Sequence, residues 1–440
     1  MALFGTDGVR GVANRDLTAE LALDLAVAAA HVLAEVGAIS KNRPVAIVGQ
    51  DSRASGEFLE AAIVAGLASA GVDVYKVGVL PTPAIAHLVA STGADLGVMI
   101  SASHNPMPDN GIKFFAKGGG KLDDALEAAI EARLNEPWDR PIGRDVGRVI
   151  VDESAAERYI YHLLSSLNTN LAGIKVVVDC ANGAASDVAP EVYARAGAEV
   201  IAISNQPNGL NINENCGSTH LENLIAAVKK HGADLGIAHD GDADRALAID
   251  AAGNVIDGDF ILAILANDWK VQTVVGTVMT NIGFIKAMSD VGISFEKTPV
   301  GDRYVLEKML ASGHKLGGEQ SGHIIMRDFA NTGDGLLTAL QLMSVMARSK
   351  KPLAELAKIM DRFPQVLINV DGVKKEKLDS SKAIAVAIGE YESKLGASGR
   401  ILLRASGTEP LVRVMVEAEN QSIAEEIAQK LASLVRLELS

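Results

Sequence analysis

Cysteine, aromatic residues and net positive charge are all scarce in this sequence of 440 residues. Its two cysteines, Cys180 and Cys216, cannot build a disulfide scaffold, which favours a reducing compartment such as the cytoplasm. The net charge of −14 argues against nucleic-acid binding, because proteins that bind nucleic acid present a basic face. If this acidic protein binds an anion, its positive charge must be concentrated locally.

Long apolar runs are missing as well. No run approaches the ~20 residues that a membrane span requires. The opening residues, MALFGTDGVRG, lack the basic and then apolar layout of a signal peptide. Hydrophobic residues nevertheless make up 48% of the chain, and its length exceeds what one core can organise. We therefore expect a cytoplasmic protein of several domains that binds neither nucleic acid nor membrane.

A unit of strand, turn, amphipathic helix and second strand recurs three times, beginning at 43–53, 174–183 and 273–281. This order predicts α/β domains with mixed, mainly parallel sheets and right-handed crossovers. After Pro364 the pattern changes to strands flanked by helical segments at 382–395 and 423–435, which predicts a smaller α+β domain. We place the four domains at 1–155, 156–254, 255–364 and 365–440.

The segment VMISASHNP (98–106) delivers reactive side chains at the end of an apolar strand. Ser101, Ser103 and His104 follow the strand directly, and Lys113 comes shortly afterwards. Ligands of open α/β sheets sit at the carboxyl ends of strands, which favours a functional turn here. The alternative is a structural cap that closes the strand.

An acidic loop, AHDGDADRALAID (238–250), carries Asp240, Asp242 and Asp244 at alternate positions. In an extended segment their side chains project to one side, where three carboxylates repel one another unless a cation compensates. An all-oxygen ligand set favours Mg²⁺ over Zn²⁺. Arg245 beside the metal could hold a phosphoryl oxygen. A solvated acidic turn is the alternative.

A third loop, LLRASGTEPLVR (402–413), combines a short Ser-Gly-Thr turn with two flanking arginines. Backbone N–H groups and hydroxyls in such a turn can cradle an anion, and the guanidinium fork suits phosphate. Ser-Gly-Thr turns are also common without a ligand.

The fourth loop, KLGGEQSGHIIM (315–326), resembles a sugar-reading segment. Glu319 and Ser321 are short polar groups that suit hydroxyls, and His323 can serve as general acid or base. A histidine in a loop can equally be structural.

The glycine-rich segment FGTDGVRGVA (4–13) with Arg10 is a weaker candidate for anion contact, and a plain turn explains it as well. Taken together, the loops indicate phosphoryl transfer, with Ser103 as the nucleophile that carries the phosphoryl group. Mg²⁺ on the three aspartates would neutralise charge on the transferring phosphate. Lys113 or His323 would move the proton of the substrate hydroxyl. Ser101 is the rival nucleophile, but Ser103 lies further into the turn.

The motifs ISASHNP, DGDADR, GGEQSGH and RASGTEP, in this order and spacing, resemble the α-D-phosphohexomutase superfamily across essentially the whole chain. Within it, GTDGVRG, Gln320 and VGDRY (300–304) resemble the phosphoglucosamine mutases. The resemblance implies four domains around a central cleft, a phosphoserine, Mg²⁺ and a hexose-phosphate substrate. It also implies a last domain that moves about a hinge near Arg362 to Val366.

The resemblance assigns roles residue by residue. Ser103 matches the phosphoserine, and it is counted with Asp240, Asp242 and Asp244 among the metal ligands. Catalytic roles, including proton transfer, fall on Ser103, Lys113, His323 and Arg10. Contacts to the transferring phosphoryl group fall on His104 and Arg245. Substrate contacts fall on Arg303, Glu319, Ser321, Arg404, Ser406, Gly407, Thr408 and Arg413.

The implied activity is interconversion of glucosamine 6-phosphate and glucosamine 1-phosphate, an isomerisation that feeds amino-sugar and cell-envelope synthesis. Phosphoserine would donate to the substrate, a 1,6-bisphosphate would turn over, and its other phosphate would return to the serine, with sugar 1,6-bisphosphate as primer. The enzyme would be a monomer or homodimer. A phosphoglucomutase or phosphomannomutase, and a non-catalytic sugar-phosphate sensor, remain alternatives. A kinase is disfavoured because no GxxxxGK[ST] stretch exists.

Overall fold

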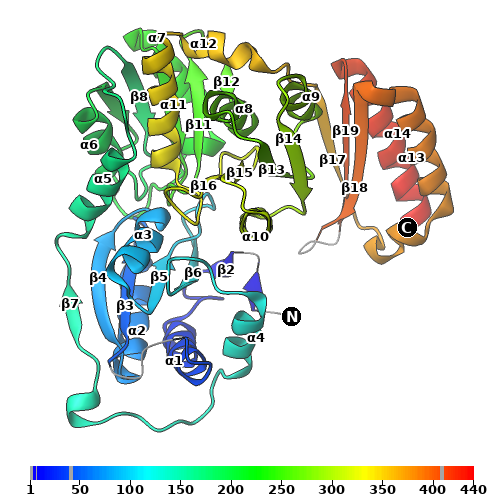
Figure 1. Cartoon of the computed structure of the whole chain (residues 1–440). Helices are drawn as coiled ribbons and strands as arrows, with labels where there is room; N and C mark the ends of the chain where they lie inside the picture. The colour runs from blue at the N-terminus through cyan, green and yellow to red at the C-terminus, as the bar shows by residue number, and fades with distance from the viewer. Residues whose placement is uncertain (1–2, 6, 39–42, 407–410) are drawn as a thin grey trace. The chain divides into compact units, whose positions relative to one another are not determined.

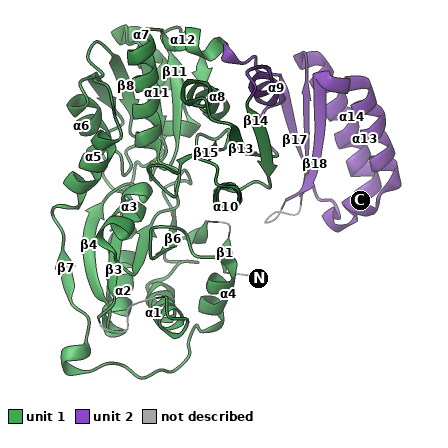
Figure 2. Cartoon of the chain, in the orientation of Figure 1, with its two compact units in different colours: residues 1–278, 293–358 green, residues 279–292, 359–440 purple. Residues whose placement is uncertain are grey.

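In the computed structural model, which describes residues 3–5, 7–38, 43–406 and 411–440, the chain forms two compact units (Figure 2). The first comprises residues 1–278 and 293–358, and the second comprises residues 279–292 and 359–440. Within the described ranges, no helix is long and apolar enough to cross a membrane.

The first sheet of the larger unit has seven strands in the order β1-β2-β6-β5-β3-β4-β7 (Figure 1). Its centre is parallel, since β3 pairs in parallel with both β4 and β5, whereas β6 runs antiparallel to β5 and β2. The strands are β1 (Phe4–Gly5), β2 (Gly8–Val12), β3 (Val45–Gln50), β4 (Asp73–Val79), β5 (Leu96–Ile100), β6 (Asp109–Ala116) and β7 (Val149–Val151).

Helices pack against this sheet through apolar side chains. Helix α1 begins after Thr18, whose side chain accepts the N–H of Leu21, and its alanine-rich face packs against α2 and α4. Apolar side chains of α1, α2 and α4 and of β3, β5 and β6 form one buried core. The helices are α1 (Ala19–Glu35), α2 (Gly56–Ser69), α3 (Thr82–Thr92) and α4 (Asp124–Ala132).

Two further sheets complete the larger unit. One has the order β12-β11-β10-β8-β9, in which β8 pairs in parallel with β9 and β10 while β11 runs antiparallel to both of its neighbours. The other has the order β14-β13-β15-β16, in which β13 pairs in parallel with β14 and β15 while β16 is antiparallel. The strands are β8 (Lys175–Asp179), β9 (Glu199–Ile203), β10 (Leu235–His239), β11 (Ala246–Asp250), β12 (Val255–Ile256), β13 (Thr273–Thr277), β14 (Ser294–Thr298), β15 (Leu316–Gly318) and β16 (Ile324–Met326). The helices are α5 (Ala155–Ser165), α6 (Val188–Arg195), α7 (Glu222–His231), α8 (Gly258–Trp269), α10 (Asp302–Ser312), α11 (Gly335–Ser349) and α12 (Leu353–Leu356).

The smaller unit holds an antiparallel sheet in the order β17-β19-β18, with α14 packed on β17 and β19 and α13 packed on β18. It also holds α9, which is tied in by Asn281, whose side-chain amide donates to the Phe363 carbonyl at 3.0 Å and to Glu417 at 3.3 Å. The elements are α9 (Ile282–Asp290), β17 (Gln365–Asp371), α13 (Lys382–Leu395), β18 (Gly399–Ala405), β19 (Leu411–Ala418) and α14 (Gln421–Leu439).

The structure confirms the predicted fold class and the three strand–helix–strand repeats. They are β3-α2-β4, β8-α6-β9 and β13-α9-β14, and the two strands of each repeat pair in parallel. In the third repeat the helix belongs to the smaller unit although both strands belong to the larger one, an allocation that the repeat pattern did not indicate.

Candidate active site

The serine loop begins where the buried strand β5 ends at Ile100. Ser103 is buried and has a φ of 52°, in the left-handed region that few non-glycine residues adopt. Its backbone N–H donates to the Ser101 hydroxyl at 2.9 Å, and that hydroxyl donates to Asp51 at 2.6 Å. The Ser101 hydroxyl therefore supports the backbone of the loop.

Arg53 is the main support of this loop. Its guanidinium is buried against Asp51 and donates to backbone carbonyls along the loop, including that of Ser103 at 2.9 Å. The Asn213 side-chain amide also donates to the Ser103 carbonyl at 2.9 Å. The motif patterns of the sequence did not indicate these supports. The one available signal was QDSR (50–53), a polar tip at the end of a predicted strand.

The acidic loop connects β10 to β11 and brings three carboxylates together. One oxygen from each of Asp240, Asp242 and Asp244 lies within 4.8 Å of the others, and all three residues are buried. The loop turns at Ala243, whose φ is 56°. The expected extended geometry was therefore wrong in detail, because a turn and not strand alternation converges the side chains.

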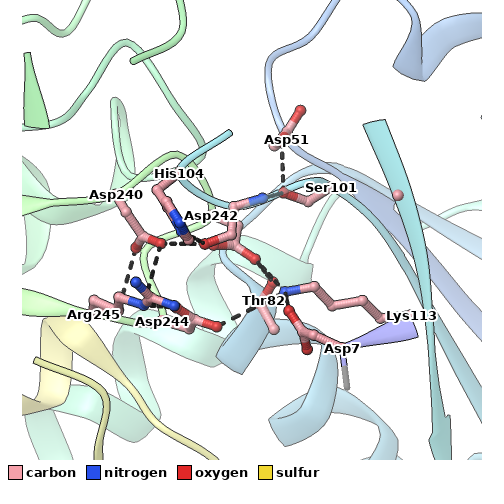
Figure 3. A network of polar contacts seen from close by, with 12 residues as sticks. Asp7, Asp51, Thr82, Ser101, His104, Lys113, Asp240, Asp242, Asp244 and Arg245 are labelled. Atoms are coloured by element: carbon pink, nitrogen blue, oxygen red, sulfur yellow. Dashed lines mark hydrogen bonds and ion pairs between the residues drawn. The ribbon is translucent and has the colours of Figure 1, made fainter. Parts of the chain in front are cut away.

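The acidic loop and the serine loop are in direct contact. The Ser103 hydroxyl donates a hydrogen bond to Asp240 Oδ2 at a distance of 2.5 Å. Gly241 makes this approach possible, since a Cβ there would lie 2.6 Å from the Ser103 carbonyl oxygen. Figure 3 shows the aspartates gathered beside Arg245 and Lys113.

The electrostatics of the three aspartates fit a cation. Burial, and then the neighbouring carboxylates, raise the pKa of Asp240, and the same two effects raise the pKa of Asp244. Burial also opposes ionisation of Asp242, but Lys113 at 2.8 Å and Thr82 at 2.6 Å hold its pKa below the usual value. Within the described part of the chain, the Oδ1 atoms of Asp242 and Asp244 are buried without a hydrogen-bond partner. A divalent metal ion would satisfy these oxygens.

Two cations lie beside the carboxylates. Arg245 Nε is 3.9 Å from Asp240 and 3.7 Å from Asp244, and despite burial these charges raise the pKa of the guanidinium. Lys113 on β6 lies 2.8 Å from Asp242 and 2.9 Å from Asp7, which also pairs with Arg10. Burial opposes the charge of Lys113, yet the carboxylates raise its pKa, so it is held as an ammonium.

His104 lies beside the serine hydroxyl, with Nδ1 3.3 Å from Ser103 Oγ. Burial, and then the charges of Arg245 and Arg10, lower its pKa to about 4. The imidazole is therefore neutral near pH 7 and can donate or accept one hydrogen bond at this position.

A buried histidine, His239, connects the two ends of the acidic loop by a hydrogen bond. The Nδ1–H of His239 donates to the Arg245 carbonyl at 2.9 Å, and its Nε2 accepts from the Tyr193 hydroxyl at 2.8 Å. Burial lowers the pKa of His239 to about 4, so the neutral ring links the two ends of the loop. Nothing in the sequence pattern had indicated Tyr193.

The fourth loop of the sequence analysis, which carries Glu319, Ser321 and His323, lies between β15 and β16. Glu319 accepts the N–H of Gly301 at 3.1 Å, and Ser321 Oγ is buried with no hydrogen-bond partner among the described residues. His323 is buried, with Nε2 3.4 Å from Asp302 and 3.8 Å from Asp244. The larger unit therefore brings His323 to the acidic loop.

Arg303, at the start of α10, has acidic partners on α4. It pairs with Asp124 and donates to Glu127 at 2.8 Å. Burial raises the pKa of Glu127 to about 7. To contact a substrate as predicted, the Arg303 guanidinium would have to give up these ion pairs with α4.

The arginine-bearing loop belongs to the smaller unit. Arg404 on β18 and Arg413 on β19 are directly paired across the antiparallel ladder, and Ser406 follows β18. Burial, and then Arg413, lower the pKa of Arg404. Like charges placed opposite each other are unfavourable, and an anion relieves this repulsion. Gly407 and Thr408 lie outside the described residues.

Comparison with known proteins places the chain in a family. Models described as phosphoglucomutase/phosphomannomutase match it in four parts: alpha/beta/alpha domain I at residues 1–139, domain II at 157–253, domain III at 257–363 and the C-terminal domain at 367–434. The chain belongs to the phosphoglucomutase/phosphomannomutase family. The predicted superfamily is thereby confirmed, and with it an isomerase of the mutase class.

Relatives in other organisms carry a more specific name. Phosphoglucosamine mutase of Acidothermus cellulolyticus is 61% identical over 440 residues, covering 99% of this chain and 95% of the relative. Phosphoglucosamine mutase of Thermobifida fusca is 61% identical over 444 residues, covering 100% and 99%.

Solved structures of the family share the fold. A phosphoglucomutase/phosphomannomutase family protein from Burkholderia thailandensis superposes with a TM-score of 0.83 at 23% identity, covering 100% of this chain and 98% of the other. The N-acetylphosphoglucosamine mutase of Aspergillus fumigatus, in complex with GlcNAc-6P and magnesium, has a TM-score of 0.71 at 18% identity, covering 100% and 96%.

Proposed function

We propose that this family member interconverts glucosamine 6-phosphate and glucosamine 1-phosphate. The names of relatives about 60% identical over the whole chain support the substrate. The observation that carries the chemistry is the contact of the Ser103 hydroxyl with Asp240, inside three buried carboxylates flanked by Arg245.

Ser103 is proposed to carry the transferring phosphoryl group. In the first transfer its Oγ–P bond breaks as a substrate hydroxyl oxygen bonds to phosphorus, and in the second the other phosphate of the 1,6-bisphosphate returns to Ser103. Mg²⁺ held by Asp240, Asp242 and Asp244, with Ser103 as a further ligand, would neutralise charge on the phosphoryl oxygens. Arg245 and His104 would contact the same oxygens. A sugar 1,6-bisphosphate would prime the serine.

Proton transfer falls to His323 in this proposal. Lys113 is held as an ammonium by Asp242 and Asp7, so it stabilises negative charge more readily than it accepts a proton. Both His323 nitrogens are buried without a hydrogen-bond partner among the described residues, which leaves them for a substrate hydroxyl. Arg10, which shares Asp7 with Lys113, is proposed to assist with phosphate.

The remaining predicted contacts serve recognition. Glu319 and Ser321 are proposed to bind sugar hydroxyls, together with Arg303. The phosphate that does not react would be held by Arg404, Ser406, Gly407, Thr408 and Arg413. Four domains divided at 155/156, 254/255 and 364/365, a central cleft, a monomeric or homodimeric state and a cytoplasmic location complete the proposal.

Turnover of glucosamine, glucose and mannose 1-phosphates, side by side with Mg²⁺ and a trace of the matching bisphosphate, tests the substrate. We expect a large preference for the glucosamine compound. Preference for glucose or mannose would transfer the same site to phosphoglucomutase or phosphomannomutase activity. No turnover of any of them would favour the sugar-phosphate sensor.

A further inference from the structure

A chain of alternating charges connects the two groups considered for proton transfer. Lys113 Nζ lies 2.9 Å from Asp7 Oδ2, and Asp7 Oδ1 lies 2.5 Å from Lys121 Nζ. Lys121 Nζ also lies 2.6 Å from Asp302 Oδ2, which is 3.4 Å from His323 Nε2. Lys121 and Asp302 form the middle of this chain, and neither has a role in the proposed transfer described above.

The five residues come from separate segments of the larger unit. Lys113 is on β6, and Lys121 follows the turn after this strand and forms an isolated antiparallel bridge with Phe115 of β6. Asp302 is the first residue of α10, and His323 directly precedes β16. The two lysines are close in sequence, whereas Asp7, Asp302 and His323 come from segments remote from them, and the alternating contacts join these segments. The Lys121 side chain is only 11% exposed, which limits screening of its two ion pairs by solvent.

His323 needs an external constraint on its ring. With no hydrogen bond to either nitrogen among the described residues, only packing and nearby charge can orient the imidazole. Gly333 gives it space, since a Cβ there would lie 2.4 Å from the ring. The nearest carboxylate oxygen to Nε2 is that of Asp302, closer than the 3.8 Å to Asp244. Lys121 fixes Asp302, which also sits favourably at a helix N-terminus.

We propose that Lys121 and Asp302 are positioning residues for proton transfer: Asp302 orients the His323 ring, and Lys121 holds Asp302 in register with Asp7 and Lys113. This inference rests on the proposed mutase activity. The alternative is a purely structural ion pair, which would contribute to stability without affecting the chemical step.

Steady-state kinetics of Lys121→Met and Asp302→Asn, with glucosamine 1-phosphate, Mg²⁺ and bisphosphate primer, test the proposal. Because small displacements of a catalytic group are costly, we expect kcat to fall roughly ten- to hundredfold while KM changes less than about threefold. Lys121→Arg keeps the charge and should recover most of the loss. Lys117→Met is the control for loss of a lysine ion pair outside the chain of charges, since Lys117 pairs with Asp95 at 3.2 Å with a side chain that is 56% exposed, against 11% for Lys121, and it should retain wild-type kcat.

A double-mutant cycle shows whether Asp302 acts through His323. If it does, adding Asp302→Asn to His323→Asn should lower kcat by less than about twofold further, because the ring to be oriented is already absent. Full multiplicative losses, or wild-type kcat in Asp302→Asn together with a lowered melting temperature, would overturn the proposal. If Lys121→Met fails to fold, the isosteric Asp302→Asn variant and its cycle decide alone. An inactive wild type would instead overturn the mutase activity, and the inference with it.

Discussion

Ser101 and Ser103 are chemically identical and two residues apart, yet the structure gives them different work. The hydroxyl of Ser101 accepts the N–H of Ser103 and donates to Asp51, so both of its functions are occupied. The hydroxyl of Ser103 meets Asp240 and His104. At the scale of single residues, the two candidate nucleophiles therefore differ in their partners: Ser101 contacts groups that shape the loop, and Ser103 contacts the acidic loop.

Ser103→Ala should abolish turnover and phosphoryl incorporation, because the variant has no oxygen to accept phosphorus. Ser101→Ala should still incorporate phosphate, with slower turnover, since it loses a support of the loop. Incubation with bisphosphate followed by mass spectrometry of the peptide containing both serines measures this directly. Phosphate found on the peptide of Ser103→Ala and absent from that of Ser101→Ala would make Ser101 the nucleophile.

At the scale of elements, the site depends on loops that approach one another closely. The acidic loop and the serine loop follow β10 and β5, which belong to different sheets. Their contact requires a residue without a side chain, Gly241, and a guanidinium, Arg53, that ties down the serine loop. The two loops can form one site only while this close contact is maintained.

Gly241→Ala should lower kcat by about a hundredfold. The added Cβ would lie 2.6 Å from the Ser103 carbonyl oxygen and 2.9 Å from Asn213 Nδ2, which forces the two loops apart. Gly389→Ala is the control, since a Cβ there meets no atom within 4 Å and the position lies inside α13. We expect the control to retain activity and to gain ~0.5–1 kcal/mol of stability from the helix position. Unchanged kcat in Gly241→Ala would contradict the close-approach argument.

The contact of α3 with α5 predicts a pH dependence of stability. His87 on α3 stacks on His162 of α5 with ring centroids 3.9 Å apart, and burial, then His162 and Arg158, lower its pKa from 6.5 to about 4. Between these values the unfolded state binds the proton and the folded state does not. The contribution of neutral His87 to the free energy of unfolding is therefore complete above pH 6.5 and is lost as pH falls toward 4.

Replacing His87 by glutamine removes this titration. Urea unfolding of wild type and His87→Gln at pH 7.5 and pH 4.5 should show wild type losing about 1–2 kcal/mol relative to the variant at the lower pH, a value discounted for the partial exposure of the ring. A difference between the two proteins that is independent of pH would exclude this linkage.

At the scale of the whole molecule, an acidic protein concentrates its cations where anions must bind. The net charge is −14, yet Lys113, Lys121 and Arg245 are gathered around the carboxylates of the larger unit, and Arg404 and Arg413 are paired in the smaller one. A bound metal ion would balance the negative charge of the three aspartates, and a bound phosphate would balance the positive charge of the paired arginines. Stability of the molecule should consequently depend on its ligands.

Mg²⁺ should raise the melting temperature of the wild type, since it binds the three converging carboxylates only in the folded state. A concentration a hundredfold above the dissociation constant corresponds to about 2.7 kcal/mol. Thermal unfolding in MgCl₂, against NaCl of equal ionic strength, measures the shift, and Asp244→Asn serves as the control with a weakened site. An equal shift in both proteins would indicate a nonspecific salt effect.

The sequence by itself determined the residue types, their order and the local architecture. Alternation of strand and amphipathic helix fixed the repeats, since it depends only on neighbouring residues. Reactive residues at strand ends, such as Ser103 and Asp240, could be found because parallel strands bring their carboxyl ends to one edge.

Only the tertiary structure decided how these loops are held together. Arg53 contacts the serine loop from 50 residues away in sequence, and Lys121 pairs with Asp302 across 181 residues. The α9 helix joined the smaller unit through Asn281 and Glu417, which lie 136 residues apart. Local patterns carry no information about such partners, because burial and charge pairing between distant segments depend on the packed chain.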